Sequence, residues 1–193
     1  MDFLRKNFLE TSELLSNFLL DNQNYVKLQD VIKLVSERHI AGGKGLICGN
    51  GGSACEAMHY AEELTGRFRK DRKALGAISL LDPSHITCVG NDWGFDYIFE
   101  RGVEALGSPR DYLLVFSTSG NSENILKAVQ KANELNILTI GLLGRDGGKV
   151  KDLLDYSFIV PAQTSDRIQE VHMVLVHTII EGIERLLFKE NYD

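Results

Sequence analysis

A histidine and a glutamate lie four residues apart in a segment of helical periodicity. They are His59 and Glu63, within residues 54–68. Residues four apart project from one face of a helix, so the imidazole and the carboxylate can reach the same ligand. On an ordinary surface helix, however, the same spacing gives an exposed ion pair that does no chemistry.

A second imidazole, that of His177, lies on the apolar segment 166–188. Imidazole gains and loses a proton near neutral pH, and a carboxylate beside it can act as a base. We therefore expect Glu63 and His177 to form an acid–base pair. His172 lies on the same segment among apolar residues, where we expect a satisfied core histidine.

Two loops rich in glycine and serine each follow an apolar run and open a helical segment. They are residues 49–53 and 117–122. Backbone N–H groups at a helix N-terminus bind anions, and hydroxyl groups add donors without adding charge. One such loop is an ordinary structural device, but two at strand ends predict a phosphate site. A third loop, residues 144–148, is expected to be a plain turn.

The first loop also allows a different function. Gly49, Gly51 and Ala54 fit the pattern GxGxxA of dinucleotide-binding proteins, and Asp82 stands near the acidic position that binds ribose. Against this interpretation, the following helix presents His59 and Glu63 on one face. A nicotinamide cofactor also has no evident use for the second, hydroxyl-bearing loop.

Short apolar runs alternate with helical segments from residue 42 onward. This alternation predicts an α/β fold, a doubly wound, Rossmann-like parallel sheet of five strands with helices on both faces. Ligands of such sheets bind at the carboxyl ends of the strands. The expected strands are residues 45–48, 77–80, 112–116, 138–143 and 156–160, and the helices expected between and after them include residues 54–68, 122–135 and 166–188.

Two amphipathic helical segments precede the first expected strand, within residues 1–40. This N-terminal pair can cap the domain or form an oligomer contact, and the sequence supports both interpretations. Residues 42–193 then form the α/β core. The whole chain, 1–193, is expected to be a single domain.

Composition excludes several classes of protein. The chain has 193 residues, of which 44% are hydrophobic and 25% charged, as expected of a globular domain. A formal net charge of -6 argues against nucleic-acid binding. Three cysteines without a CxxC pair predict neither a disulfide framework nor a cysteine-based zinc site. No signal peptide or membrane span is recognisable, so we expect a cytoplasmic protein.

Five longer motifs run through most of the chain: GNGGSACEAMHYAEELTGRF, SHITCVGNDWGFDYIFERGVEALG, FSTSGNSENILKA, GRDGGK and DRIQEVHMVLVH. Together they closely resemble the phosphoheptose isomerases, a branch of the sugar-isomerase (SIS) domain family. The resemblance implies a single SIS domain that converts sedoheptulose 7-phosphate to D-glycero-D-manno-heptose 7-phosphate. This is the first step towards the ADP-heptose of bacterial lipopolysaccharide. The resemblance also implies a cytoplasmic homotetramer with active sites at subunit interfaces.

The resemblance assigns roles to individual positions. The implied catalytic residues are Glu63 and His177. The implied zinc ligands are His59, Glu63, Gln169 and His177. The implied substrate-binding residues are Asn50, Gly51, Gly52, Ser53, Glu63, Asn91, Asp92, Ser117, Thr118, Ser119, Ser122, Asp166 and Gln169.

A related branch of the same domain family acts as adaptors in bacterial replication initiation. Those proteins resemble this chain in the loops but lack the carboxylate and the second histidine. Glu63 and His177 therefore separate an enzyme from an adaptor. Isomerase, non-catalytic adaptor and nucleotide-dependent enzyme stay open as function classes.

The implied zinc raises two questions of chemistry. A carboxylate bound to a cation loses basicity, so Glu63 must leave the metal to act as a base, or the metal itself must polarise the carbonyl. Gln169 and His177 are eight residues apart, about 12 Å along a helix. They must either lean towards one ion or serve sites of different subunits.

Overall fold

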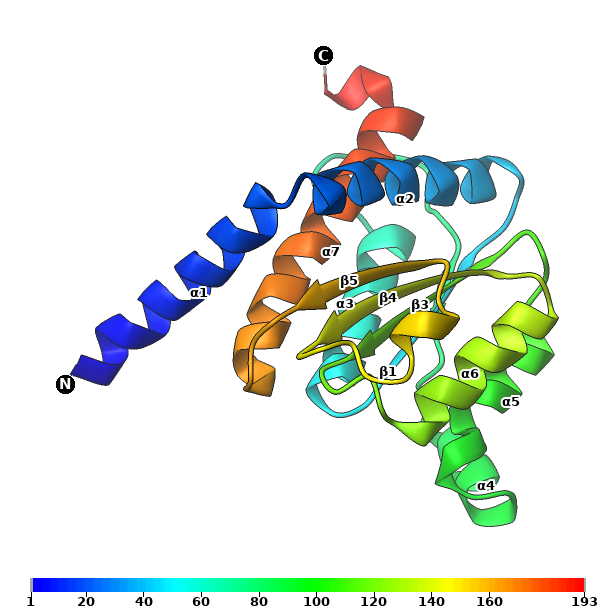
Figure 1. Ribbon diagram of the computed structural model, residues 1–193. Helices are drawn as coiled ribbons and strands as arrows, with labels where there is room; N and C mark the ends of the chain where they lie inside the picture. Colours follow the sequence, from blue (N-terminus) through cyan, green and yellow to red (C-terminus); the bar gives the residue numbers. More distant parts are fainter. Residues whose placement is uncertain (1, 193) are drawn as a thin grey trace.

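The computed structural model describes residues 2–192. Its centre is a five-stranded parallel sheet with the strand order β2-β1-β3-β4-β5, which confirms the predicted α/β architecture (Figure 1). The strands are β1 (Gly45–Gly49), β2 (Ala77–Ser79), β3 (Tyr112–Ser117), β4 (Leu138–Gly144) and β5 (Tyr156–Val160). Each lies within one or two residues of its predicted bounds.

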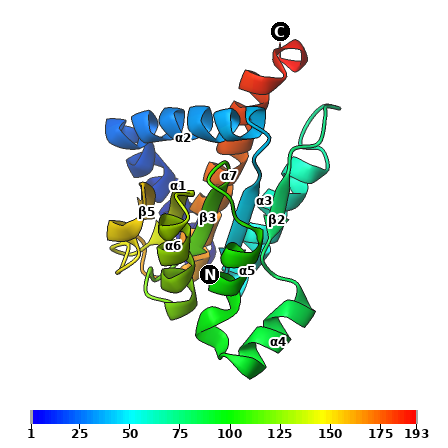
Figure 2. The same cartoon turned by 90° about the vertical axis from the view of Figure 1, so that its right-hand side faces the viewer.

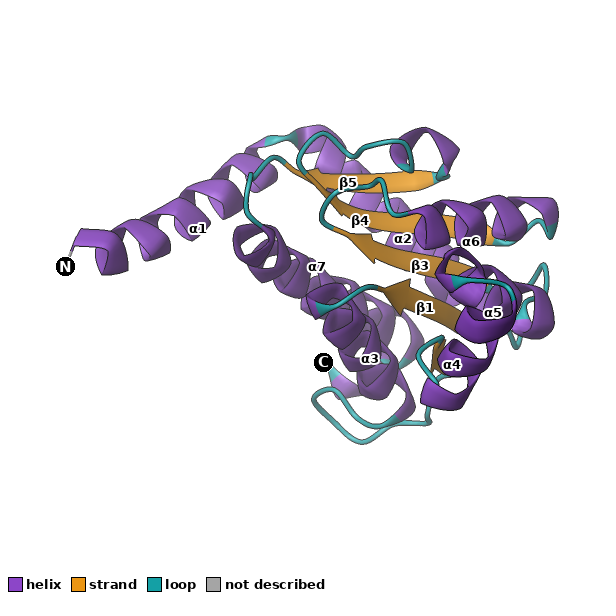
Figure 3. Cartoon of the chain, turned by 90° about the horizontal axis from the view of Figure 1, so that it is seen from below, coloured by secondary structure: helices purple, strands orange, loops and turns teal. Residues whose placement is uncertain are grey.

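Helices cover both faces of this sheet (Figure 3). One face carries α2 (Asn22–Ile40), α3 (Gly52–Thr65) and α7 (Ser165–Leu187). The other carries α4 (Pro83–Asp92), α5 (Ile98–Leu106) and α6 (Glu123–Glu134). The remaining helices are α1 (Asp2–Leu20) and three short 3-10 helices, η1 (Phe95–Tyr97), η2 (Lys151–Leu153) and η3 (Lys189–Asn191).

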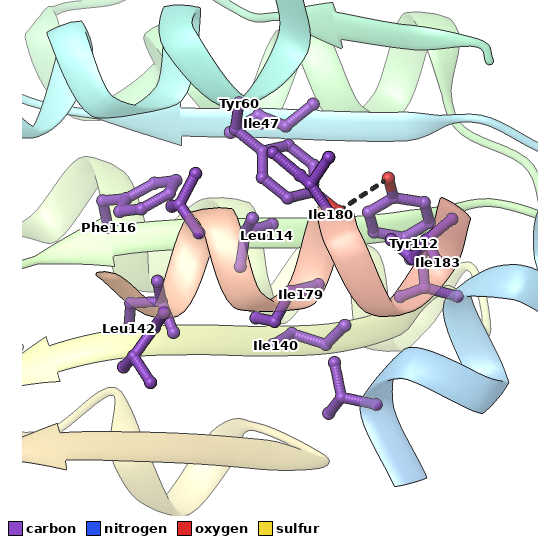
Figure 4. Packing of buried hydrophobic residues seen from close by; sticks show 14 of the residues in the cluster. Ile47, Tyr60, Tyr112, Leu114, Phe116, Ile140, Leu142, Ile179, Ile180 and Ile183 are labelled. Carbon is purple, nitrogen blue, oxygen red and sulfur yellow. Dashed lines mark hydrogen bonds between the residues drawn. The ribbon is translucent and has the colours of Figure 1, made fainter. Parts of the chain in front are cut away.

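The central strands β1, β3 and β4 are largely apolar because both of their faces are buried. Along β3, Tyr112, Leu114 and Phe116 pack under α3 and α7 (Figure 4), whereas Leu113 and Val115 pack under α5 and α6. This is the side-chain alternation of a strand between two helical layers. It explains why the sequence shows continuous apolar runs rather than an alternating pattern.

Strand order reverses beside β1, because the chain moves from β1 outward to β2 and then returns to β3 on the other side. Gly49 pairs with Phe116, so the loops after β1 and β3 begin side by side. The helices that follow these two loops, α3 and α6, lie on opposite faces of the sheet. Such a switch point leaves a crevice at the carboxyl ends of the strands, the usual ligand site of this architecture.

Helices α4 and α5 were not among the helices named from the sequence. In α4 only Val89 is buried, so the helix has almost no apolar stripe for a periodicity argument to detect. Asp82, the candidate ribose ligand, is the N-cap of α4 and accepts a hydrogen bond from His85 N–H at 2.8 Å. Its carboxylate therefore has a structural role at this helix end.

Helix α1 extends away from the body of the molecule (Figure 1). Five of its large apolar side chains are exposed, those of Phe3, Leu4, Phe8, Leu9 and Leu20. Among residues 2–192, no helix combines the length and apolar composition needed to cross a bilayer.

Candidate active site

The first predicted anion loop lies between β1 and α3. Gly51 is the N-cap of α3 with φ +59° and ψ -121°, a conformation that only glycine adopts without strain. A side chain on Gly52 would collide with the amide of Gln169, since a Cβ there would lie 2.5 Å from Nε2. Glycine at both positions therefore lets the chain turn into the helix and lets α7 approach it closely. Ser53 is buried, and its Oγ lies 3.5 Å from Gln169 Nε2.

The second predicted anion loop lies between β3 and α6, and two of its hydroxyl groups accept hydrogen bonds from backbone N–H groups of the same loop. Ser117 Oγ accepts from Gly120 N–H at 3.0 Å, and Ser119 Oγ accepts from Asn121 N–H at 3.2 Å. A hydroxyl that accepts a hydrogen bond keeps its own proton to donate. Ser122 is the N-cap of α6, and its side chain makes no capping hydrogen bond. These hydroxyls can therefore donate to an oxyanion.

The loop 144–148 is a turn, as expected, but it also packs against the second anion loop. Val150 N–H donates to Gly120 O at 3.0 Å, and Lys149 N–H donates to Asn121 Oδ1 at 3.1 Å. Asn121 Nδ2 in turn donates to Ser119 O at 2.8 Å. The turn thus supports the loop that carries the hydroxyl groups.

Glu63 and His59 on α3 meet His177 on α7, in a partly exposed position. His59 Nε2 lies 3.1 Å from His177 Nε2 and 3.4 Å from Glu63 Oε1. Burial raises the pKa of Glu63, as does the nearby charge of Glu62, while the two histidines oppose the shift. The spacing seen in the sequence therefore produces a real cluster of one carboxylate and two imidazoles.

These three groups fit a transition-metal ion. One potential ligand atom from each lies within 4.8 Å of the others. Bond lengths of about 2.0–2.1 Å place the ligand atoms of tetrahedral zinc about 3.3 Å apart, close to the distances around His59 Nε2. His59 Nδ1 lies 2.9 Å from Glu62 Oε1, the arrangement in which a carboxylate orients a metal-binding imidazole. The fourth implied ligand, Gln169, instead has its side chain against Gly52 and Ser53.

Two of the predicted substrate residues lie apart from this cluster. Asn91 and Asp92 end α4, and Asn91 Nδ2 donates to Asp92 Oδ1 at 2.8 Å. Helix α4 packs on α5 and η1, and two views place it well away from α7 (Figures 1 and 2).

Two further predicted residues lie where α7 begins. Thr118 Oγ1 lies 3.1 Å from Ser165 Oγ, at the start of the helix. Asp166 is exposed in the first turn, and a hydrogen bond from Thr164 lowers the pKa of its carboxyl. Thr118 belongs to the second anion loop, so its contact with Ser165 places the start of α7 beside that loop.

His172 is buried, as expected, but only half satisfied. Its Nε2 lies 3.2 Å from Leu143 O, whereas Nδ1 has no hydrogen-bond partner among the described residues. The nearest acid is Glu56, also buried, with Oε1 3.5 Å from Nδ1.

Several residues that support the site were not identified from the sequence. Phe68 stacks on His177, with ring centroids 5.8 Å apart and an interplanar angle of 26°. The side chain of Arg72 is fully buried, and its guanidinium donates to the backbone oxygens of Glu63 and Leu64, at 2.6 and 2.8 Å. Asn124 is hydrogen-bonded to Asn50. None of these contacts has a signature in local spacing.

Comparison with known proteins places the chain in a family. The SIS domain model matches residues 8–144. A phosphoheptose isomerase from Fusobacterium nucleatum is 55% identical over 180 residues, which are 93% of each chain. The solved phosphoheptose isomerase structures from Francisella tularensis and Neisseria gonorrhoeae superpose with TM-scores of 0.90 and 0.86, at 36% and 37% identity. Each alignment covers 95% of this chain and 97% of the other. The chain belongs to the phosphoheptose isomerase family of SIS-domain proteins.

Proposed function

We propose that this protein interconverts sedoheptulose 7-phosphate and D-glycero-D-manno-heptose 7-phosphate in the cytoplasm, as a step towards ADP-heptose. The observation that carries the proposal is the meeting of Glu63 and His177 around His59. Glu63 and His59 lie on α3, which begins at the first anion loop, and His177 lies on α7, whose first residue contacts the second anion loop. A non-catalytic adaptor has no use for a half-buried carboxylate beside two imidazoles.

The distance from loops to cluster suits the substrate. Glu63 is ten residues beyond Ser53, about 15 Å along α3, and side chains on a helix lean back towards its N-terminus. An extended seven-carbon chain with its phosphate is about 10 Å long. We propose that the C7 phosphate binds on the second anion loop and that the carbon chain extends along α3, with C1 and C2 near Glu63 and His177.

The reaction moves one proton from C1 to C2 and another from the C1 oxygen to the C2 oxygen. Glu63 removes a proton from C1, the electron pair forms the C1–C2 double bond, and protonated His177 gives its proton to the C2 oxygen. The resulting cis-enediol loses the O1 proton to His177, and Glu63 returns its proton to C2. Both side chains end in their starting states, and each transfer of this type contributes about 10²- to 10⁴-fold.

We propose zinc as the metal held by His59, Glu63 and His177, with Gln169 as the fourth ligand that the family resemblance implies. A side chain bound to zinc is a poor proton carrier, so we propose that Glu63 and His177 are not bound to the ion when they act as base and acid. A zinc ion there would supply positive charge next to the oxygens on C1 and C2. The chain's own contribution is to orient His59 through Glu62 and to keep Glu63 partly shielded from water.

The Glu63→Gln variant tests the function. It keeps the size of the side chain but cannot take a proton, so turnover of sedoheptulose 7-phosphate, followed by NMR, should fall about 10²- to 10⁴-fold. Binding of inorganic phosphate should persist. Glu134→Gln, at an exposed carboxylate near the end of α6, is the matched control. Near-normal turnover in Glu63→Gln would contradict the proposal.

We also propose that Asn91 and Asp92 complete the site of a second subunit, in a homotetramer that uses the exposed apolar face of α1. The remoteness of α4 from α7 supports this arrangement. If each site combines groups of two chains, mixing the Glu63→Gln and Asp92→Asn proteins should restore activity that neither has alone. Hybrid oligomers seen by native mass spectrometry without any restored activity would refute it.

A further inference from the structure

Two asparagine side chains form a closed amide pair between the anion loops. Asn50 Nδ2 donates to Asn124 Oδ1, and Asn124 Nδ2 donates to Asn50 Oδ1, both at 2.9 Å. Asn50 directly follows β1, and Asn124 lies in the first turn of α6. Asn124 is only 2% exposed. A buried amide of this kind is costly to leave unpaired, so each side chain holds the other in place.

The amide pair lies at the point where the strand order of the sheet reverses. It joins the residue after β1 to the helix after β3, the two neighbouring strands beside which the strand order reverses. Helices α3 and α6 diverge from this point to opposite faces of the sheet. The pair therefore bridges the crevice in which ligands of such sheets bind.

No other side-chain hydrogen bond between residues 2 and 192 joins the first loop to the second loop or to α6. Both loops present N–H donors at a helix N-terminus, so their relative position decides whether they converge on one anionic substrate. A misplacement of about 1 Å at such a site can cost about 100-fold in rate.

We propose that Asn124 is a positioning residue that sets the spacing of the two anion loops through its amide pair with Asn50. Asn50 then acts on the substrate through this pair, and its side chain is not a direct ligand of the sugar phosphate. The proposal rests on the proposed isomerase function for its substrate, but the loop spacing can be tested with inorganic phosphate alone.

A double-mutant cycle tests the pair with Asn50→Ala, Asn124→Leu and the double variant. Leucine keeps the branched shape of the Asn124 side chain but removes its hydrogen-bonding groups, and Asn124→Ala takes its place if the leucine variant does not fold. Each single variant should raise the KM for sedoheptulose 7-phosphate and the calorimetric Kd for inorganic phosphate about tenfold, with a smaller change in kcat. The double variant should be no worse than the weaker-binding single variant. Gln130→Ala, exposed on the same helix, is the control.

Three results would overturn the proposal. Unchanged phosphate binding in Asn124→Leu, with weakened binding in Asn50→Ala, would make Asn50 a direct ligand. Effects that multiply in the double variant would show two independent roles. A loss of active protein at unchanged KM and Kd would show that the pair serves folding only. If the wild type binds phosphate but does not turn over sedoheptulose 7-phosphate, the isomerase function fails while the phosphate titrations still test the pair.

Discussion

The imidazole of His177 is held between two other rings. His59 meets it edge-on, with centroids 5.3 Å apart, and Phe68 stacks on its face. Arg69 lies over the same phenyl ring at 5.0 Å and pairs with Glu181 at 2.8 Å, one helical turn beyond His177. The orientation of the His177 imidazole therefore depends on Phe68, which itself exchanges no proton.

Replacing Phe68 should separate orientation from binding. Phe68→Leu removes the flat surface against which His177 rests, so kcat should fall about tenfold while KM stays near its original value. Phe68→Tyr keeps the ring and should restore most of the lost kcat in steady-state assays. A Phe68→Leu enzyme with unchanged kcat would show that the stacking does not position the imidazole.

The second anion loop and the turn 144–148 form one element in three dimensions. Gly120 has φ +61°, and a Cβ there would lie 1.9 Å from Gly147 O. Gly148 has φ +54°, and a Cβ there would lie 2.5 Å from the backbone oxygens of both Ser119 and Gly120. Two glycines with positive φ thus allow backbone to pack on backbone, which no side chain would permit.

Gly120→Ala should break this packing. The left-handed backbone alone costs about 1–2 kcal/mol, and the clash adds to it, so the free energy of unfolding in urea should fall by at least that amount. Phosphate binding should weaken as well, because the loop must shift. Gly90→Ala is the stability control, since a Cβ at that helical position meets open space. Equal stability of the two variants would contradict this account.

A buried ion pair joins distant parts of the molecule. Arg72 Nε lies 2.7 Å from Glu184 Oε1 on α7, and both side chains are completely buried. Tyr192, near the C-terminus, donates from its hydroxyl to Glu184 Oε2 at 2.6 Å. Since Arg72 also binds the last turn of α3, the pair fixes the helix of Glu63 against the helix of His177.

Arg72→Leu should leave the charge of Glu184 buried without its cation. The free energy of unfolding should then fall by about 3–5 kcal/mol in urea titrations. The matched control is Arg185→Leu, which removes an exposed partner of Glu181 and should cost less than about 1 kcal/mol. A loss in Arg72→Leu no greater than in the control would mean that the pair is dispensable.

His39 should make the stability of the whole molecule depend on pH. Burial lowers its pKa from 6.5 to about 4, and the nearby charge of Arg72 acts in the same direction. Between these values the unfolded chain binds a proton that the folded chain does not. The free energy of unfolding should therefore fall as pH drops from 6.5 towards 4, by at most about 1.4 kcal/mol per pH unit from this group.

Carboxylates titrate in the same pH range, so the comparison must be with a variant that lacks the imidazole. His39→Gln should show a shallower loss of stability than the wild type in urea titrations between pH 6.5 and 4. Identical slopes would show that His39 is not held neutral in the folded protein.

The sequence by itself determined the strands, the sheet and the likeness to the isomerase family. Apolar runs such as residues 112–116 are continuous because both faces of a central strand are buried, so consecutive residues must all be apolar. The proximity of His59 and Glu63 could also be predicted, because residues four apart lie on one face of a helix. Glycine-rich loops after strands could be recognised for the same local reason.

Only the tertiary structure decided which side chains of different helices and strands lie in contact. His177 joins His59 from a helix 118 positions away, and the Asn50–Asn124 pair closes over 74 positions. The structure also separated Asn91 and Asp92 from the cluster and turned Gln169 towards the first loop. Local spacing constrains only residues within a turn or two of each other, whereas these contacts follow from how the sheet orders its strands and how α3 and α7 pack side by side.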